Sequence, residues 1–202
     1  MAGILDRISA RLGRKPLSPE ELESRFTELK RSAEPAVAPA MDKETMAMFL
    51  HQANYNLFEI SHVDDLAAAM AAFETPLPLA LSPQPEVRDL PWQANGFSFC
   101  DDVKLPVLAV IRATAGIAET GTITISSKEA PSALLYLSEE LLVILDKSDV
   151  VPLMDDVWRT IAPVEQRALN LISGPSRTAD VEQTLQVGAH GPRRVYLWLV
   201  SQ

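Results

Sequence analysis

Short continuous apolar runs dominate the second half of the chain and predict buried strands. Residues 107–111 and 141–145 are almost entirely apolar, which is typical of strands covered on both faces of a sheet. Residues 122–126 alternate threonine with isoleucine, a β-branched pattern that favours a strand. We expect further strands at 56–60, 77–81, 168–172 and 195–200.

Apolar residues at helical spacing lie between several of these runs. Met46, Phe49 and Ala53 share one face of a helix predicted over 43–53, and Asp42 is placed to cap its first turn. Further helices are predicted over 63–73, 152–161 and 178–185, and a turn is predicted over 113–117.

Strands that alternate with helices require crossover connections. This pattern predicts an α/β domain with an open, mainly parallel sheet and flanking helices. Residues 82–106 do not follow the pattern, because prolines interrupt every longer periodic stretch there. We expect this loop to pack against the domain through Trp92, Phe97 and Phe99.

The first 41 residues differ in pattern from the rest of the chain. Ile4, Ile8 and Leu12 lie on one face of a short helix predicted over 4–13, and residues 32–41 are a Pro- and Ala-rich linker. We therefore divide the chain into an N-terminal arm, 1–41, and an α/β domain, 42–202. A helix this short needs a packing surface, which its own domain, a second copy of the chain (a homo-oligomer) or another protein could provide.

Charge and hydropathy exclude two classes of partner. The formal net charge of −9 gives no general attraction to nucleic acid, which is itself a polyanion. The longest apolar stretches, 105–111 and 195–200, are far shorter than the ~20 residues that a membrane span needs. Charged residues also interrupt 1–15, unlike a secretory signal. We expect a soluble, cytoplasmic protein without a membrane span.

Cysteine and histidine placement argues against a metal site within this chain. Cys100 is the one cysteine, which excludes an internal disulfide and a thiolate-only cluster. His51, His62 and His190 are too far apart to form a zinc-binding motif.

The richest candidate site is the turn that follows the predicted strand 168–172. Ligands bind beyond the carboxyl ends of strands in open parallel sheets, and the turns at 112–121, 146–149 and 173–178 are predicted to lie there. We predict that the last of these is a strand–turn–helix that binds a small anion, with free N–H groups at the helix start. Its candidate ligand-binding residues are Ser173, Gly174, Ser176, Arg177, Thr178 and Asp180. The alternative is that Ser176 caps the helix and Asp180 complements the helix dipole.

Two smaller motifs are further candidates. Thr120, Gly121 and Thr122 place two hydroxyls around a turn at a strand end, although an ordinary turn would have the same residues. His190 lies between glycines in a loop, where it could titrate or bind a ligand, or serve as a structural residue. No nucleophile–histidine arrangement and no dinucleotide- or phosphate-binding glycine motif is present.

Three segments resemble a known family. Ile172–Leu185 and Val187–Arg193 are similar to the C-terminal signature of the lactate utilization protein C family (LutC/YkgG), whose members carry the lactate-utilization (LUD) domain. Ile117–Thr122 resembles its second signature, and Arg11–Arg14 its usual N-terminus. The resemblance implies a fold like those of CoA transferases and formyltetrahydrofolate cyclo-ligase. It also implies a bacterial three-protein system that oxidises L-lactate to pyruvate, with iron–sulfur clusters in the partner subunits of the same operon.

Three functional hypotheses follow. The leading one is a non-redox subunit or regulator of lactate oxidation that binds a small anion at Ser173–Asp180 and holds no cofactor itself. The alternative is a stand-alone enzyme that acts on a phosphate- or nucleotide-bearing substrate, with Glu119 as nucleophile or base. The third is a structural scaffold without a small ligand. Turnover by the purified chain separates the first two.

Overall fold

A computed structural model describes residues 11, 13, 18–32, 42–71, 75–102, 104–160, 167–179, 185–187 and 191–201. The chain divides into two compact units, Met1–Val37 and Ala38–Gln202. The predicted helix 4–13 lies almost entirely outside the described residues, and so does the predicted linker apart from Ser32.

The described part of the first unit is mainly one helix, α2 (Pro19–Ser32), for which we made no prediction. A reciprocal capping pair starts it: Glu21 Oε2 accepts from the Ser18 N–H at 2.8 Å, and Ser18 Oγ accepts from the Glu21 N–H at 3.2 Å. Its apolar residues Leu22 and Phe26 are exposed within this unit. The capping pair therefore stabilises the first turn of this helix.

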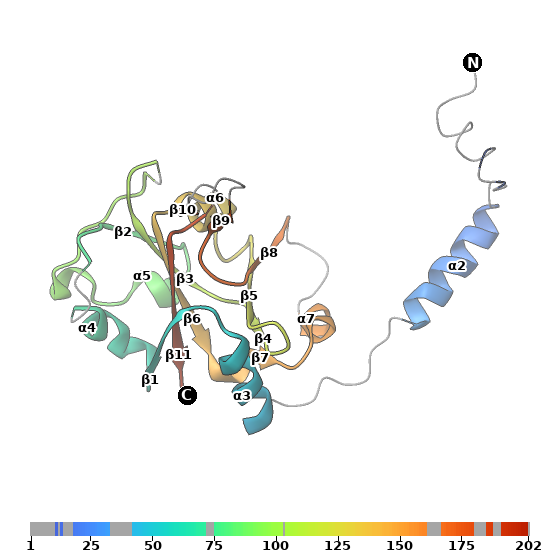
Figure 1. Cartoon of the computed structure of the whole chain (residues 1–202), viewed down its shortest axis with the longest axis horizontal. Helices are drawn as coiled ribbons and strands as arrows, with labels where there is room; N and C mark the ends of the chain where they lie inside the picture. The colour runs from blue at the N-terminus through green and yellow to red at the C-terminus, as the bar shows by residue number, and fades with distance from the viewer. Residues whose placement is uncertain are drawn as a thin grey trace, which may run out of the picture. The chain divides into compact units, whose positions relative to one another are not determined.

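A parallel sheet forms the centre of the second unit (Figure 1). Its strands follow the order β1-β11-β6-β3-β2, and every neighbouring pair is parallel. The predicted mainly parallel sheet is confirmed. The strands are β1 (Asn56–Ile60), β2 (Leu79–Leu81), β3 (Leu108–Arg112), β6 (Glu140–Asp146) and β11 (Arg194–Val200).

A second sheet, with the order β7-β4-β5-β8, packs against one face of the first. Here β5 pairs antiparallel with both β4 and β8, while β4 and β7 are parallel. The predicted turn at 113–117 is wrong, because residues 115–117 are buried and pair on both sides as β4. The strands are β4 (Ala115–Ile117), β5 (Thr122–Ser126), β7 (Val150–Val151) and β8 (Leu169–Ile172).

The predicted helix over 178–185 is wrong at both ends, and residues 180–184 lie outside the described part of the chain. β9 (Arg177–Ala179) and β10 (Leu185–Val187) form an antiparallel pair in which Arg177 lies opposite Val187. The pairing provides hydrogen-bond partners for the backbone N–H and C=O groups of both strands. A helix this short would have to meet the same need after an unfavourable nucleation step.

Alternating side chains of the parallel strands fill two separate layers. Ile111, Val143 and Leu199 face the second sheet, whereas Val110, Leu142 and Trp198 face the opposite side. Helix α3 (Lys43–Gln52) buries Phe49 in the first layer, and α6 (Ser132–Leu137) adds Leu134 and Leu135. On the other face lie α4 (Leu66–Ala71) and α5 (Pro85–Arg88), as Figure 1 shows. The arrangement is therefore layered, with a helical layer on one face of the parallel sheet.

Two details of the helices bear on the predictions. Asp42 caps α3 as predicted, since its Oδ1 accepts from the Thr45 N–H at 2.8 Å. Helix α7 (Met154–Thr160), predicted over 152–161, covers the outer face of the second sheet through Val157. No helix in the described ranges is long and apolar enough to cross a membrane.

Candidate functional site

The Ser173–Ser176 turn lies at a different edge of the molecule from the one we predicted. Strand β8 belongs to the second sheet and runs antiparallel to β5, so the turn does not follow a strand of the parallel sheet. Instead the Ser176 N–H donates to Pro192 O at 2.9 Å, which fixes the turn beside the amino end of β11. Because a strand and not a helix follows, the predicted helix start is wrong, while anion binding by this turn stays a prediction.

Three predicted residues nevertheless come together at this turn. Thr120 Oγ1 donates to Thr122 Oγ1 at 2.8 Å, and Thr122 Oγ1 lies 2.7 Å from Ser173 Oγ. These hydroxyls belong to segments that are far apart in the chain and that separately resemble the two family signatures. The fold therefore unites both signatures in one hydrogen-bonded cluster.

One glycine of each signature, Gly121 and Gly174, packs closely against the residues that connect α3 to β1. Gly121 has φ +61°, and a Cβ there would lie 2.5 Å from the Gln52 carbonyl carbon. Gly174 has φ +133°, and its Cβ would lie 2.8 Å from Asn54 Nδ2 and 3.0 Å from Asn54 O. Both positions require glycine in conformation and in space. Residues 52–54 are thus held between the two signature turns.

Tyr55 joins this connection to β8. Its hydroxyl donates to Ile172 O, directly before Ser173, and burial raises the pKa of the phenol above its ordinary value. The hydroxyl is therefore a neutral donor at physiological pH, and it fixes the start of the Ser173–Ser176 turn.

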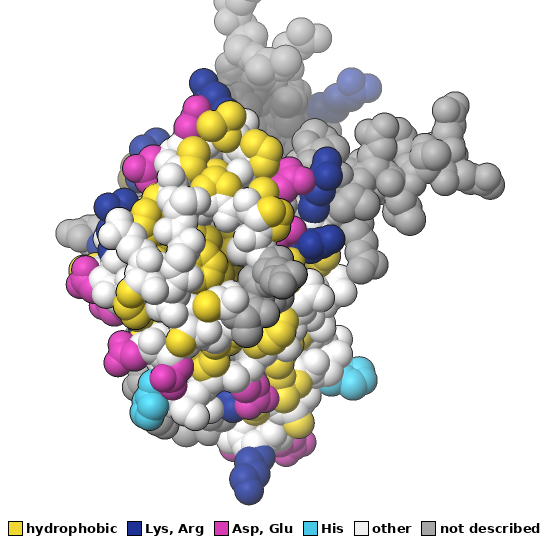
Figure 2. Space-filling model, turned by 90° about the vertical axis from the view of Figure 1, so that its left-hand side faces the viewer, with side chains coloured by type: hydrophobic (Ala, Val, Ile, Leu, Met, Phe, Trp, Pro, Cys, Tyr) yellow, Lys and Arg dark blue, Asp and Glu magenta, His cyan; other side chains and the backbone are white. Residues whose placement is uncertain are grey.

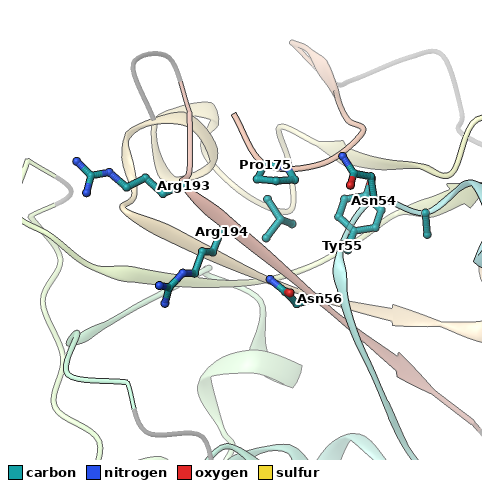
Figure 3. Close-up of a pocket in the computed structure, with 8 residues that line it drawn as sticks. Asn54, Tyr55, Asn56, Pro175, Arg193 and Arg194 are labelled. Atoms are coloured by element: carbon teal, nitrogen blue, oxygen red, sulfur yellow. The ribbon is translucent and has the colours of Figure 1, made fainter. Parts of the chain in front are cut away.

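A cavity of about 310 Å³ opens beside this cluster, at the amino ends of β1 and β11. Figure 3 shows Asn54 and Tyr55 on one side, Pro175 above, Asn56 below, and Arg193 and Arg194 on the other side. The two arginine side chains extend away from Asn54 and Tyr55. The remaining lining residues are Ala53 and Val195.

Two acidic residues hold these arginines. Arg193 Nη1 lies 3.1 Å from Glu139 Oε1, and Arg194 Nη1 lies 3.2 Å from Glu140 Oε1. The guanidinium side chains are 59% and 65% exposed, and exposed ion pairs of this kind contribute only about 0–1 kcal/mol. Neither ion pair therefore contributes much to the stability of the fold.

The other predicted site residues are placed as follows. Ser176 packs beside Gly191, whose Cβ would lie 3.3 Å from the serine Cβ. Arg177 and Thr178 begin β9, and their side chains lie outside the described residues, as do Asp180 and His190 entirely. Glu119 is exposed, and its Oε1 accepts from the Met154 N–H at 2.7 Å, at the start of α7.

The two remaining predicted segments, 112–121 and 146–149, do begin at the carboxyl ends of parallel strands, although 115–117 form β4. Arg112, which ends β3, forms an ion pair with Asp146, which ends the adjacent strand β6. Burial raises the pKa of both Glu129 and Asp149, and nearby Asp146 raises that of Asp149 further. Within the described ranges, no three acidic, histidine or cysteine side chains are grouped to hold a metal ion.

Sequence reasoning missed the side of the cavity that comes from Asn54, Asn56, Arg193 and Arg194. Asparagines before a strand are common in turns and carry no particular chemical signal. The paired arginines were visible as two adjacent cations directly before the last strand, but only the fold shows that they lie beside Pro175.

The fold defines the first level of kinship. A crystal structure of a DUF162 family protein from Deinococcus radiodurans aligns with a TM-score of 0.59 over 78% of this chain and 97% of that protein, at 17% identity. This protein therefore has the α/β fold of that DUF162 protein. The likeness to CoA transferases stays a prediction.

The sequence comparisons define the second level. Residues 107–200, which contain both signature segments, match the LUD domain family model. Lactate utilization protein C of Bacillus pumilus is 42% identical over 89 residues, which cover 40% of this chain and 37% of that protein. Uncharacterized protein YkgG of Escherichia coli is 32% identical over 123 residues, or 56% of this chain and 53% of that protein. The predicted resemblance is confirmed. The matched region spans between 37% and 53% of the length of these two relatives.

Proposed function

We propose that this protein is a non-redox component of a bacterial system that oxidises L-lactate to pyruvate, and that it binds a small carboxylate in the cavity beside Pro175. The proposal rests on one observation: Pro175 and Arg193, which belong to the C-terminal signature, line this cavity, and the Thr122–Ser173 contact joins the turn before Pro175 to the other signature segment. Its relatives named lactate utilization protein C supply the metabolic context.

The chemistry of the cavity suits a carboxylate. Arg193 and Arg194 provide planar cations that can donate two parallel hydrogen bonds to it. The amides of Asn54 and Asn56, which line the same cavity, add neutral donors. A hydroxy acid such as lactate offers both an anion for the guanidinium side and a hydroxyl for the amide side.

Electron transfer in this proposal belongs to partner proteins. An iron–sulfur cluster normally takes four protein ligands, most often cysteine thiolates, and this chain has one cysteine, Cys100. We infer that iron–sulfur proteins of the same operon, in the cytoplasm, accept the electrons while this chain binds the carboxylate and regulates or supports their assembly.

The test measures binding and growth together. L-lactate and pyruvate are titrated into the purified chain by calorimetry, with Arg193→Ala and Arg194→Ala as cavity variants. Loss of a charged hydrogen bond worth about 1.5–3 kcal/mol predicts a ten- to hundredfold weaker affinity. Arg167→Ala is the matched control, because Arg167 is exposed and lies before β8, at the opposite end of that strand from Ser173.

Growth of a strain without the gene tests the metabolic part. We expect no growth on L-lactate, rescue by the wild-type gene and by Arg167→Ala, and poor rescue by the cavity variants. Normal growth of the deletion strain would overturn the metabolic assignment. Absence of saturable binding, or equal binding by the cavity variants, would overturn the cavity. Turnover of a phosphate-bearing substrate by the chain alone would favour the enzyme hypothesis instead.

A further inference from the structure

A second cavity, of about 290 Å³, lies at the opposite edge of the parallel sheet from the first. Leu81, Arg88, Phe99 and Asp101 line it. Leu81 ends the edge strand β2, and Arg88 ends α5. Figure 2 shows the side of the molecule that carries α4, where exposed hydrophobic side chains lie among acidic and basic ones.

The cavity opens because a short strand pairing stops. Residues 98–100 run parallel beside β2: the Leu79 N–H donates to Ser98 O at 2.8 Å, and the Cys100 N–H donates to Leu79 O at 2.9 Å. This pairing is a single bridge between Leu79 and Phe99 and does not continue to Leu81. Asp101 and Leu81 therefore stand at the same level on two segments that have separated.

Buried side chains of the 82–102 segment hold the backbone that carries Arg88, one of the residues that line the cavity. Pro85 starts α5, and Val87 and Trp92 are buried beneath it. Trp92 Nε1 donates to Val87 O at 2.7 Å, and its ring meets Phe97 edge-on with centroids 5.7 Å apart. Arg88 Nε donates to Ser82 O at 3.2 Å. The expected packing of this loop is confirmed for Trp92 and Phe97, whereas Phe99 stays 42% exposed at the cavity.

The cavity walls carry one cation and one anion that do not neutralise each other. Arg88 and Asp101 both line the space, and no ion pair joins either of them to another residue in the described ranges. Phe99 and Leu81 supply apolar surface between them. A ligand that complements all four side chains has a carboxylate for Arg88, an ammonium for Asp101 and an apolar body.

We propose that this cavity binds a free apolar α-amino acid in its zwitterionic form. An α-amino acid carries its carboxylate and its ammonium on the same α-carbon. Arg88 would bind the carboxylate and Asp101 the ammonium, while Phe99 and Leu81 cover the side chain. This site is separate from the carboxylate cavity and would give the protein a second small-molecule input. Its solvent-exposed cation and anion predict binding in the millimolar range.

L-leucine is the probe, measured by NMR titration of the full chain. Three analogues each lack one feature: 4-methylpentanoate has no ammonium, isoamylamine has no carboxylate, and glycine has no apolar side chain. We expect each to bind at least about tenfold more weakly than L-leucine, because each leaves one wall of the cavity without its complement.

Two variants test the assigned contacts. Arg88→Ala and Asp101→Asn should each weaken L-leucine binding by about tenfold or more. Glu86→Gln is the matched control, since Glu86 is an exposed acid on the same helix that does not line the cavity. Both tested residues are exposed, so the variants should keep the thermal stability of the wild type.

Equal binding of L-leucine and its single-charge analogues would overturn the proposal. So would an unchanged affinity in both variants, or no saturable shift at concentrations on the order of 50 mM. Because Arg193 and Arg194 lie in the other cavity, lactate binding and L-leucine binding should fail independently of each other.

Discussion

Replacing Gly121 with alanine should destabilise the domain far more than the loss of a glycine ordinarily does. An alanine with a left-handed φ costs about 1–2 kcal/mol. Its Cβ would also meet Gln52 C at 2.5 Å and Ala53 N at 2.6 Å, both of them backbone atoms, which cannot move aside as a side chain can. Overpacking adds about 1–3 kcal/mol, so the total loss in the free energy of unfolding is about 2–5 kcal/mol.

Gly96 provides the matched control, because it also has a positive φ, +85°, but nothing lies within 4 Å of its Cβ position. Gly96→Ala should cost only the conformational part, about 1–2 kcal/mol. At about 2–4 °C per kcal/mol for a domain of this size, Tm should fall by about 4–20 °C for Gly121→Ala and about 2–8 °C for Gly96→Ala.

Urea unfolding measures both changes on one scale, provided that the m-value is unchanged. A second readout is lactate affinity, which should fall only for Gly121→Ala, because a shift of Ala53 deforms the wall of the proposed carboxylate cavity. Equal destabilisation by the two substitutions would refute the close-approach reasoning and leave only the backbone conformation as the reason for glycine.

Three further predictions concern polar side chains of the α/β domain and their contacts. Burial raises the pKa of Glu129, so the folded state loses stability as the pH rises from the ordinary glutamate pKa of 4.5 to the raised value. Glu129→Gln should therefore raise Tm at neutral pH and lose that advantage in acid; a constant advantage in thermal unfolding would contradict this. Arg112→Met should cost about 3–5 kcal/mol by leaving Asp146 buried without its cation, and adding Asp146→Leu should recover most of the loss in urea unfolding. Thr122→Val and Ser173→Ala should show a coupling of about 1 kcal/mol in a double-mutant cycle, whereas additive losses would mean that their 2.7 Å contact contributes nothing.

The strands of the parallel sheet were predictable because their signal is local. An apolar run such as Leu141–Leu145 is buried on both faces wherever it lies in the sheet, so its composition alone identifies it. The second sheet was harder to predict. Strand β4 has three residues, Ala-Gly-Ile, which are too few to show an alternating or β-branched pattern. Only their pairing with β5 and β7 makes them a strand.

The candidate site shows the same division. Thr122 and Ser173 were predicted as separate candidates, and the structure brings their hydroxyls together, while ligand binding at either segment stays a prediction. The position of the turn was wrong because the direction of β8 is decided by its antiparallel partner β5, which no property of residues 168–172 reveals. Asn54 was missed because its place beside Gly174 depends on a contact between distant segments.

The position of β11 has a consequence for the order in which the protein can assemble during synthesis. This strand follows the other four strands of the parallel sheet in sequence, yet it lies between β1 and β6 in that sheet. Until it leaves the ribosome, β1 has no neighbour and one side of β6 is an open edge that another chain could pair with. The parallel sheet is therefore completed only when β11 inserts between β1 and β6. Until Val200 has emerged from the ribosome, we expect the exposed edge of β6 to make the nascent chain prone to aggregation unless a chaperone binds it.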